Sequence, residues 1–266
     1  MIFTKMSGAG NDFIVVDNTG GDLDGALQPD FVQELCRRCL GVGADGLLEL
    51  LPPEGPEAFR MRYYNSDGGR ASMCGNGARC ICCFAMSRGL VEEGREFIFA
   101  SDAGLHTGLA ISEDTAKVWM TEPKVVFMNR RMDFGITEPV SLVNTGVPHA
   151  VVMRTTLEDG TFEKFAPLLR HHPLLGPEGA NADWMEVRPD GSVGVRTFER
   201  GVEGETLACG TGAVAVAVAL SESRGDFKLP VNLQVRSGLF LTVGRDEKGW
   251  WLSGQAKAVY RGFLIV

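Results

Sequence analysis

The segment Cys74-Gly75-Asn76-Gly77-Ala78 is followed 135 residues later by a close copy, Cys209-Gly210-Thr211-Gly212-Ala213. This separation is about half of the 266-residue chain, which indicates an internal duplication. A predicted strand and a polar, glycine-containing turn precede each copy, and an apolar segment follows each one. We therefore expect two similar halves, in each of which the cysteine lies at the start of a helix.

The two helices expected after the cysteines are apolar nearly all round, over residues 80–85 and 214–220. A helix with apolar residues on every side is normally buried. The sequence thus predicts a mixed α/β fold, mainly antiparallel sheet, with two pseudo-symmetric domains that are each a sheet wrapped around a central apolar helix. Symmetry places the N-terminal half at residues 1–120 plus 256–266 and the C-terminal half at residues 121–255.

The remaining elements follow from apolar periodicity and turn residues. Helices are expected over residues 29–40, where Pro29 starts the helix and Gly41 ends it, and over residues 162–170. Strands are expected over residues 2–6, 13–16, 61–65, 97–99, 116–120, 125–127, 141–144, 150–153, 184–187, 193–198, 233–235, 239–243, 250–254 and 256–266.

The composition excludes several classes of partner. The formal net charge is −8 and no block is rich in Lys and Arg, so the chain lacks the positive stripe that binds nucleic acid or an anionic membrane. The longest strongly apolar run, residues 213–220, is too short to span a membrane, and residues 1–6 lack the pattern of an export signal. An odd number of cysteines, seven, favours reduced thiols. We expect a cytoplasmic protein.

The paired cysteines suit one kind of chemistry. A thiol has an ordinary pKa of about 8.5, and the positive end of a helix favours the thiolate. The free N–H groups at the same helix start can bind a carboxylate. One thiolate could remove an α-proton while a second thiol delivers a proton to the opposite face, which inverts a stereocentre without a metal or cofactor. Cys74 and Cys209 are the candidates.

Two other motifs in the sequence carry weaker signals. The segment from Gly41 to Gly46 matches the dinucleotide fingerprint GxGxxG, but the motif needs a strand before it and a helix after it, whereas here a helix precedes and a strand follows. Cys36 and Cys39 have the CxxC spacing of a metal or redox site without a second pair. We expect no nucleotide and no metal, and we assign Cys36, Cys39, Cys80, Cys82 and Cys83 to the core.

Seven motifs lie in order along nearly the whole chain, at residues 5–13, 41–46, 65–68, 73–79, 146–149, 181–183 and 199–212. In these motifs the sequence resembles the diaminopimelate epimerase family nearly from end to end. The resemblance implies an isomerase that interconverts LL- and meso-2,6-diaminopimelate in bacterial lysine and cell-wall precursor biosynthesis, without a cofactor. It also implies a homodimer and an active site in the cleft between the two halves.

The resemblance assigns roles residue by residue. Cys74 would be the proton donor and Cys209 the proton acceptor, with His149 and Glu199 tuning the pKa values of the thiols. Backbone N–H groups would hold the reacting carboxylate, and polar side chains would bind chiefly the far end of the substrate. Arg and Asn suit that task because they offer hydrogen bonds to a carboxylate and an ammonium group. The substrate-binding residues would be Asn11, Asn65, Gly75, Asn76, Asn181, Glu199, Arg200, Gly210 and Thr211.

Structural roles, without a part in binding or catalysis, are alternatives for several of these residues. Asn11, Asn65 and Asn181 could be turn residues, Glu199 and Arg200 a solvated ion pair, and His149 a structural histidine. Three features depart from the common family pattern. Val147 stands where many relatives have Asn, and Gly46 follows Asp45 where some have Gln. The loop over residues 199–206 is one residue longer than the shortest form.

Two rival functions are also open. A proline or hydroxyproline racemase-type epimerase would share the paired cysteines, but those relatives have Cys-Gly-His where this chain has Asn76 after Cys74 and Gly75. A non-catalytic amino-acid-binding protein of the same fold would not need the thiols. Retention of both Cys74 and Cys209 favours an enzyme.

Overall fold

The computed structural model describes residues 1–225 and 227–265. The chain divides into two units, described separately below: unit 1 is Met1–Trp119 with Ser253–Val266, and unit 2 is Met120–Leu252. Val266, the last residue of the strand expected over residues 256–266, lies outside the described residues.

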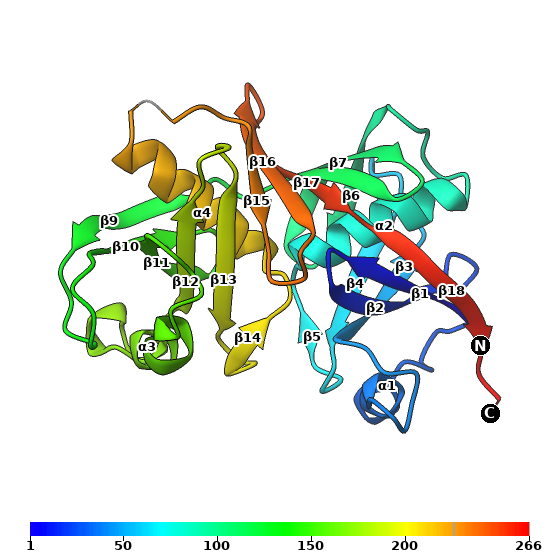
Figure 1. The fold of residues 1–266 in the computed structure, drawn as a ribbon. Helices are drawn as coiled ribbons and strands as arrows, with labels where there is room; N and C mark the ends of the chain where they lie inside the picture. The colour runs from blue at the N-terminus through cyan, green and yellow to red at the C-terminus, as the bar shows by residue number, and fades with distance from the viewer. Residues whose placement is uncertain (226, 266) are drawn as a thin grey trace. The chain divides into compact units, whose positions relative to one another are not determined.

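Unit 1 is built from strands that surround one long helix, α2 (Figure 1). Its elements are β1 (Ile2–Gly8), β2 (Asn11–Asp17), α1 (Pro29–Cys36), β3 (Gly46–Leu51), β4 (Arg60–Asn65), β5 (Arg70–Ala71), α2 (Gly75–Ser87), β6 (Glu96–Ser101), β7 (Gly104–Ser112), β8 (Thr115–Trp119) and β18 (Lys257–Phe263).

The strands of unit 1 pair mostly antiparallel. β18 pairs with β1, β1 with β2, β3 with β4, β6 with β7 and β7 with β8 in this sense, whereas β2 and β3 run parallel. α2 contacts β1, β2, β3, β4, β7, β8 and β18. Its residues from Gly75 to Ala85 are all buried, and those from Ala78 to Ala85 lie, apart from Arg79, in a core cluster with side chains such as Phe13, Leu48 and Phe99.

Unit 2 repeats this plan around α4, which Figure 1 shows passing behind β12 and β13. Its elements are β9 (Lys124–Arg130), β10 (Val140–Asn144), β11 (Pro148–Arg154), α3 (Thr161–Arg170), the 3-10 helix η1 (Pro173–Leu175), β12 (Asn181–Val187), β13 (Val193–Glu199), β14 (Gly204–Thr206), α4 (Gly210–Ser223), β15 (Val231–Gln234), β16 (Phe240–Asp246) and β17 (Gly249–Gln255), whose last three residues belong to unit 1.

Unit 2 contains both kinds of strand pairing. β9, β10 and β11 are antiparallel neighbours, β11 and β12 are parallel with His149 opposite Asn181, and β12 and β13 are antiparallel with Asp183 opposite Thr197. α4 contacts β9 to β13 and β16, and it is buried from Gly212 to Leu220. The predicted mixed α/β fold, with each half wrapped around a buried helix, is confirmed.

Several local predictions differ from the structure. Cys39, which the sequence assigns to the core, is exposed, and the short strands β5 and β14 are not among the expected strands. The first helix ends at Cys36 instead of Leu40, because the chain turns there: the N–H groups of Gly41 and Gly43 bond to the carbonyls of Arg37 and Leu35. β7 was not expected at all. Its sequence contains Gly104 and Gly108, and glycine weakens the strand pattern on which the prediction depends.

None of the helices in the described residues is both long enough and apolar enough to cross a membrane.

Burial of α4 on all sides predicts a strong response to added volume. Ala217, in the middle of the helix, is fully buried, so Ala217→Leu should lower the free energy of unfolding by about 1–3 kcal/mol. Urea unfolding followed by circular dichroism measures this change. The control Glu222→Ala, at an exposed position of the same helix, should change it by less than about 0.5 kcal/mol. Equal effects at the two positions would contradict the packing described here.

Candidate active site

Cys74 is the residue that caps the start of α2. Its backbone is extended (φ −141°, ψ 118°), and its half-buried Sγ accepts a hydrogen bond from the backbone N–H of Gly77 at 3.4 Å. A negative charge on this sulfur would lie against the positive end of the helix. The predicted position of Cys74 at a helix start is confirmed.

The side chain of Asn11 links Cys74 to a network of charged groups. Its Nδ2 donates to Asp45 Oδ2 at 2.7 Å, which leaves Oδ1 to face the Cys74 thiol at 4.0 Å and to accept from Asn76 Nδ2 at 3.2 Å. Asp45 in turn pairs with Arg38 at 2.8 Å. The amide of Asn11 is therefore held in one orientation by a carboxylate.

The ends of four strands meet at this position in unit 1. Asn11 begins β2 opposite Gly8, the last residue of β1, and Asn65 ends β4 opposite Gly46, the first residue of β3. A Cβ atom on Gly8 would lie 2.9 Å from the carbonyl oxygen of Asn76, so only glycine lets β1 approach the first turn of α2 this closely. Within the described residues, the side chain of Asn65 makes no hydrogen bond.

Cys209 holds the corresponding position at the start of α4 but in a different environment. Its side chain is 7% exposed, and its Sγ lies 3.4 Å from the hydroxyl of Thr211. Burial raises the pKa of the Cys209 thiol well above its ordinary value, and the charges of Glu199 and Asp183 raise this pKa further. The position at a helix start alone predicts a lowered pKa for Cys209, but desolvation of the thiol outweighs that effect.

A chain of hydrogen bonds leads from Cys209 into the core of unit 2. Thr211 Oγ1 lies 3.0 Å from His149 Nε2, and His149 Nδ1 lies 2.7 Å from Asp183 Oδ2. A carboxylate only accepts hydrogen bonds, so Nδ1 carries a proton, and Nε2 is an acceptor when the ring carries only that one proton. The hydroxyl of Thr211 then donates to Nε2 and can accept from the thiol. This arrangement can pass a proton from Cys209 to His149.

Asp183 is itself fixed by its surroundings. Its second oxygen accepts a 2.7 Å hydrogen bond from Thr197, and both His149 and Asp183 are fully buried. A Cβ atom on Gly212 would lie 2.6 Å from Asp183 Oδ1, so the glycine in the second cysteine motif allows α4 to pack directly on this carboxylate.

Asn181 and Arg200 meet at the loop that follows β13. Asn181 Oδ1 accepts from the backbone N–H of Arg200 at 2.7 Å, and its Nδ2 lies 3.3 Å from His149 Nε2. The guanidinium of Arg200 pairs with the exposed Glu178 at 3.0 Å. Asn181 is 3% exposed, so the structure uses its amide to hold the loop and the imidazole together, and its direct contact with substrate stays a prediction.

The predicted site residues therefore form two groups, one in each unit. Asn11, Cys74, Gly75 and Asn76 are joined at the start of α2, with Asn65 at the same end of the strands. The second group is joined at the start of α4 and consists of His149, Asn181, Cys209, Gly210 and Thr211. Glu199 is the last residue of β13, and Arg200 follows it.

Two residues that orient the site were not assigned from the sequence. Asp45 holds Asn11, and Asp183 holds His149. The sequence held a signal for Asp183. Residues 181 and 183 point to the same face of a strand, so both can lie beside His149 on the neighbouring strand. The partner of Asn11 lies 34 residues away in sequence, and no local pattern identifies it.

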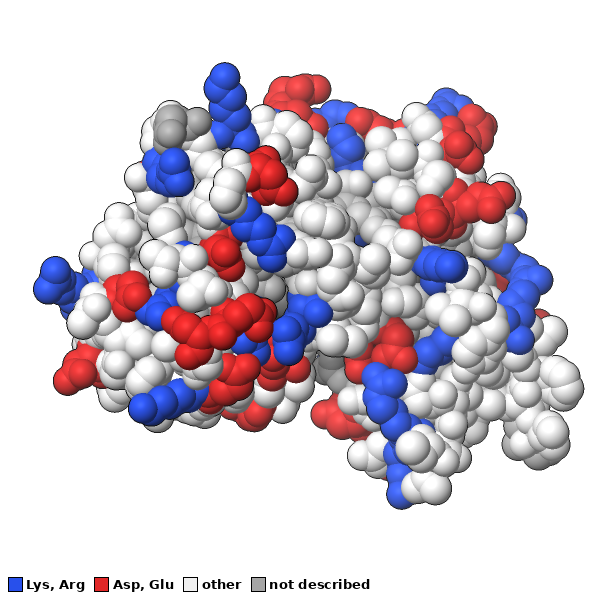
Figure 2. Space-filling view, viewed as in Figure 1, with Lys and Arg blue, Asp and Glu red and all other residues white. Residues whose placement is uncertain are grey.

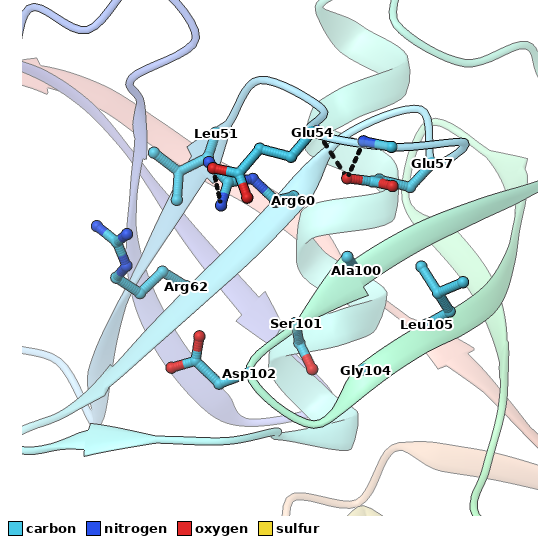
Figure 3. A pocket seen from close by; sticks show the side chains of 11 residues that line it. Leu51, Glu54, Glu57, Arg60, Arg62, Ala100, Ser101, Asp102, Gly104 and Leu105 are labelled. Atoms are coloured by element: carbon cyan, nitrogen blue, oxygen red, sulfur yellow. Dashed lines mark hydrogen bonds and ion pairs between the residues drawn. The ribbon is translucent and has the colours of Figure 1, made fainter.

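A cavity of about 390 Å³ lies elsewhere in unit 1, and Cys74 is not among its lining residues. Figure 3 shows its charged side chains paired close by: Arg60 with Glu54, and the carboxylate of Glu57 with the backbone N–H groups of Glu54 and Gly55. These groups are already satisfied, so we do not assign the cavity to the site. Among the described residues, no group of three or more His, Cys, Asp and Glu side chains is placed to hold a metal ion.

Figure 2 shows both basic and acidic side chains on the drawn face, with several acidic side chains gathered at its lower left.

Comparison with known proteins gives consistent results. A sequence model of the family described as diaminopimelate epimerase matches residues 3–126 and 141–259. The chain is 37% identical over 279 residues to a diaminopimelate epimerase of Aquifex aeolicus, covering 99% of this chain and 98% of that protein. It is 38% identical over 268 residues to a diaminopimelate epimerase of Chlorobaculum tepidum, covering 98% and 100%. In fold it is similar to a PhzF-family phenazine biosynthesis protein of Bacillus anthracis, with a TM-score of 0.78 at 16% identity over 100% of this chain and 99% of that one.

The environment of Cys209 predicts slow alkylation. Because burial raises the pKa of this thiol and covers the sulfur, iodoacetamide at neutral pH should modify Cys209 far more slowly than the exposed Cys39. Peptide mapping by mass spectrometry over a time course measures both rates in one sample. Similar rates at Cys209 and Cys39 in the native protein would contradict the burial and the raised pKa of Cys209. The difference between the two rates should vanish when the protein is unfolded in urea.

Proposed function

Because this chain belongs to the diaminopimelate epimerase family, we propose that Cys74 and Cys209 are the two acid–base groups with which it epimerises diaminopimelate. In this mechanism one sulfur removes the α-proton as the other delivers a proton to the opposite face of the same carbon. The proposal makes the chain a two-base isomerase that needs no cofactor.

One observation carries the proposal: each unit places a cysteine at the first residue before a buried helix, and glycine follows it in both motifs. The first-turn N–H groups of a helix have no acceptor within the helix. At α2 these groups belong to Gly75 and Asn76, and at α4 to Gly210 and Thr211. We propose that they bind the reacting carboxylate and stabilise the charge that builds on it as the α-proton leaves.

The two thiols are proposed to differ in protonation at rest. The raised pKa of Cys209 favours the neutral thiol. At Cys74, the hydrogen bond donated by the backbone N–H of Gly77 favours the thiolate. This distribution makes Cys74 the proton acceptor and Cys209 the proton donor in the direction of reaction that starts from this resting state, the reverse of the assignment expected from the sequence. In the opposite direction of the reaction the two cysteines exchange roles, so Cys209 must first lose its proton. The hydrogen bonds from Cys209 through Thr211 to His149 offer that proton a path.

The polar residues around the two helix starts are proposed to bind the rest of the substrate. Arg200 and Glu199 would recognise the distal carboxylate and ammonium groups, and Asn65 would add donors and acceptors from its side chain. Asn11 and Asn181 are held by other groups, with Asp45 and the backbone of Arg200 fixing their amides, so each would present a defined atom.

We propose LL-2,6-diaminopimelate as the substrate and the meso isomer as the product, as a step toward lysine and cell-wall precursors. We also propose a cytoplasmic location, since the free cysteines suit a reducing compartment, and no nucleic-acid partner. A proline-type racemase remains the alternative function. The family match and the names of the relatives at 37% and 38% identity favour diaminopimelate.

The two-base mechanism predicts a specific loss in cysteine variants. With LL-diaminopimelate in deuterated water, proton NMR should show the α-proton signal disappear as the meso isomer forms. Cys74→Ala and Cys209→Ala should each lower this rate by at least about a hundredfold, because general acid–base groups contribute about 10²–10⁴-fold. Both variants should keep the circular dichroism spectrum of the native protein.

Controls give each result a meaning. Cys39→Ala removes an exposed thiol outside the site and should keep full activity. Full activity in either Cys74→Ala or Cys209→Ala would rule out the mechanism. Exchange with proline or hydroxyproline but not with diaminopimelate would retain the chemistry and change the substrate.

We further propose that the protein forms a homodimer through β18. This strand lies at one side of β1, and nearly all of its residues are exposed, including the apolar Val259 and Phe263. Ile2, opposite Phe263 on β1, is exposed as well. A long strand with exposed apolar residues is suited to pairing with a second copy of the chain.

A charge on this strand should weaken the dimer. Light scattering coupled to size-exclusion chromatography should give twice the mass of the chain for the native protein and a concentration-dependent shift toward the single-chain mass for Val259→Lys. Val126→Lys is the matched control, because Val126 is equally exposed on β9 (58% against 57%). A native protein with the mass of one chain would refute the dimer.

A further inference from the structure

Arg79 is a buried cation five residues after Cys74 on α2. Its side chain is fully buried, and its guanidinium reaches back to the first turn of the helix. Nη1 donates to the carbonyl of Gly75 at 3.3 Å, and Nη2 donates to Asn76 Oδ1 at 2.9 Å and to the carbonyl of Gly8 at 3.5 Å. Gly75 and Asn76 directly follow Cys74, so the positive charge is held at the start of the helix.

Arg79 differs from the other buried arginines in its partners. Arg196 is 4% exposed and pairs with Glu163 and Glu205, each at 2.7 Å. Within the described part of the chain, no carboxylate lies within 4.0 Å of the Arg79 guanidinium, and its Nε has no hydrogen-bond partner. Burial of a charge without a counter-ion is costly, so a cation at such a place calls for an anion nearby.

Thiols are the groups that can supply that anion. Burial lowers the pKa of Arg79, and negative charge on the neighbouring thiols, Cys80 and then Cys74, would raise it. Burial raises the pKa of Cys80, of Cys82 and of Cys83, the last to about 12, so these three stay neutral. Cys74 is half-buried and already accepts the N–H of Gly77, which leaves it as the thiol that can ionise at the helix start to which the guanidinium donates its hydrogen bonds.

The duplicated motif supplies a comparison within the same chain. The position five residues after Cys209 is Val214, so the second copy has no cation at the equivalent place. Acidic side chains surround Cys209 instead, with Glu199 and Asp183 acting on it. The two copies of the motif have thus acquired opposite electrostatic surroundings.

We propose that Arg79 is a positioning residue for the reaction: its buried positive charge keeps Cys74 in the thiolate form, and its hydrogen bonds to Gly75 and Asn76 fix the first turn that carries this thiolate. This inference deepens the proposed function, on which its catalytic meaning rests. Arg79 itself contacts neither the substrate nor the proton that moves.

Most of the other charged and titratable side chains on the elements around α2 have partners of their own. Asp45 is linked to Cys74 through the amide of Asn11, and Tyr63 packs in the same core cluster as Cys74. The remaining ones are Lys5 with Asp12, Asp12 with Arg38, Asp17 with Arg88, Glu49 with Arg62 and Tyr64, Arg60 with Glu54, His106 with Ser101, Lys117 over the ring of Trp119, Asp114 with Ser112 and Thr115, and the exposed Lys257, Tyr260 and Arg261 on β18.

The proposal is tested by the pH dependence of Cys74 alkylation in Arg79 variants. Iodoacetamide labelling at a series of pH values, read by peptide mapping, gives the pH midpoint for Cys74. Arg79→Gln should move this midpoint upward by about 1 pH unit or more, since an adjacent opposite charge shifts a titration by about 1–3 units. Arg79→Lys keeps the charge but loses the planar fork of donors, so it should keep most of the native midpoint.

The controls separate this role from a structural one. Cys39 in the same samples should keep its midpoint, and Arg196→Gln should destabilise the protein without moving the midpoint of Cys74. Equal shifts in Arg79→Gln and Arg79→Lys, or no shift in Arg79→Gln, would overturn the proposal. In the native protein the midpoint must also be insensitive to salt, because a buried charge is poorly screened; this check decides the matter if Arg79→Gln does not fold.

Labelling does not require turnover, so the two proposals can fail separately. If the native protein shows no α-proton exchange but Arg79→Gln shifts the midpoint, the proposed function fails and the role of Arg79 in ionising Cys74 stands. If both hold, Arg79→Gln should lower kcat at neutral pH about tenfold with little change in KM, because the side chain does not bind the substrate.

Discussion

The backbone N–H groups in the first turns of α2 and α4, which have no acceptor within their own helices, are the constraint on which the rest of the structure depends. Both helices are buried over most of their length, so water cannot satisfy these donors as it does at a surface helix. Local acceptors take some of them, as Cys74 Sγ does for Gly77. A carboxylate suits the others, and the glycines of the motif keep their approach open. The burial that stabilises each half thus also creates its anion-binding position.

Duplication explains why the two halves look alike, but the proposed chemistry requires them to differ. A two-base epimerase needs one thiolate and one thiol at the same time, and identical surroundings would give both cysteines the same charge. The structure meets this need with the buried Arg79 behind Cys74, and with the buried Asp183 and the partly buried Glu199 near Cys209. The asymmetry lies one layer behind the cysteines, so it leaves the two helix starts geometrically similar.

Sequence alone predicted the features that local patterns encode. The repeat located both helix starts, and apolar periodicity located most strands, although Gly104 and Gly108 hid β7 and turns after Cys36 shortened the first helix. The residues that orient the site were harder to find. Asp45 and Asp183 act on Asn11 and His149 through strand register and loop contacts over more than 30 residues of sequence. The raised pKa of Cys209 depends on burial, which a helix-start rule does not include.

Asp45 and Asp183 matter because they set the orientation of the polar groups of the site before any substrate binds. An amide can present either its oxygen or its nitrogen, and an imidazole either of two tautomers, so each would cost reorganisation during the reaction if left free. Asp45 fixes the first choice for Asn11 and Asp183 fixes the second for His149. In the same way, Arg79 determines the charge of Cys74. On this argument the family motifs supply the reacting groups, and buried charges outside the expected site determine the state in which those groups begin.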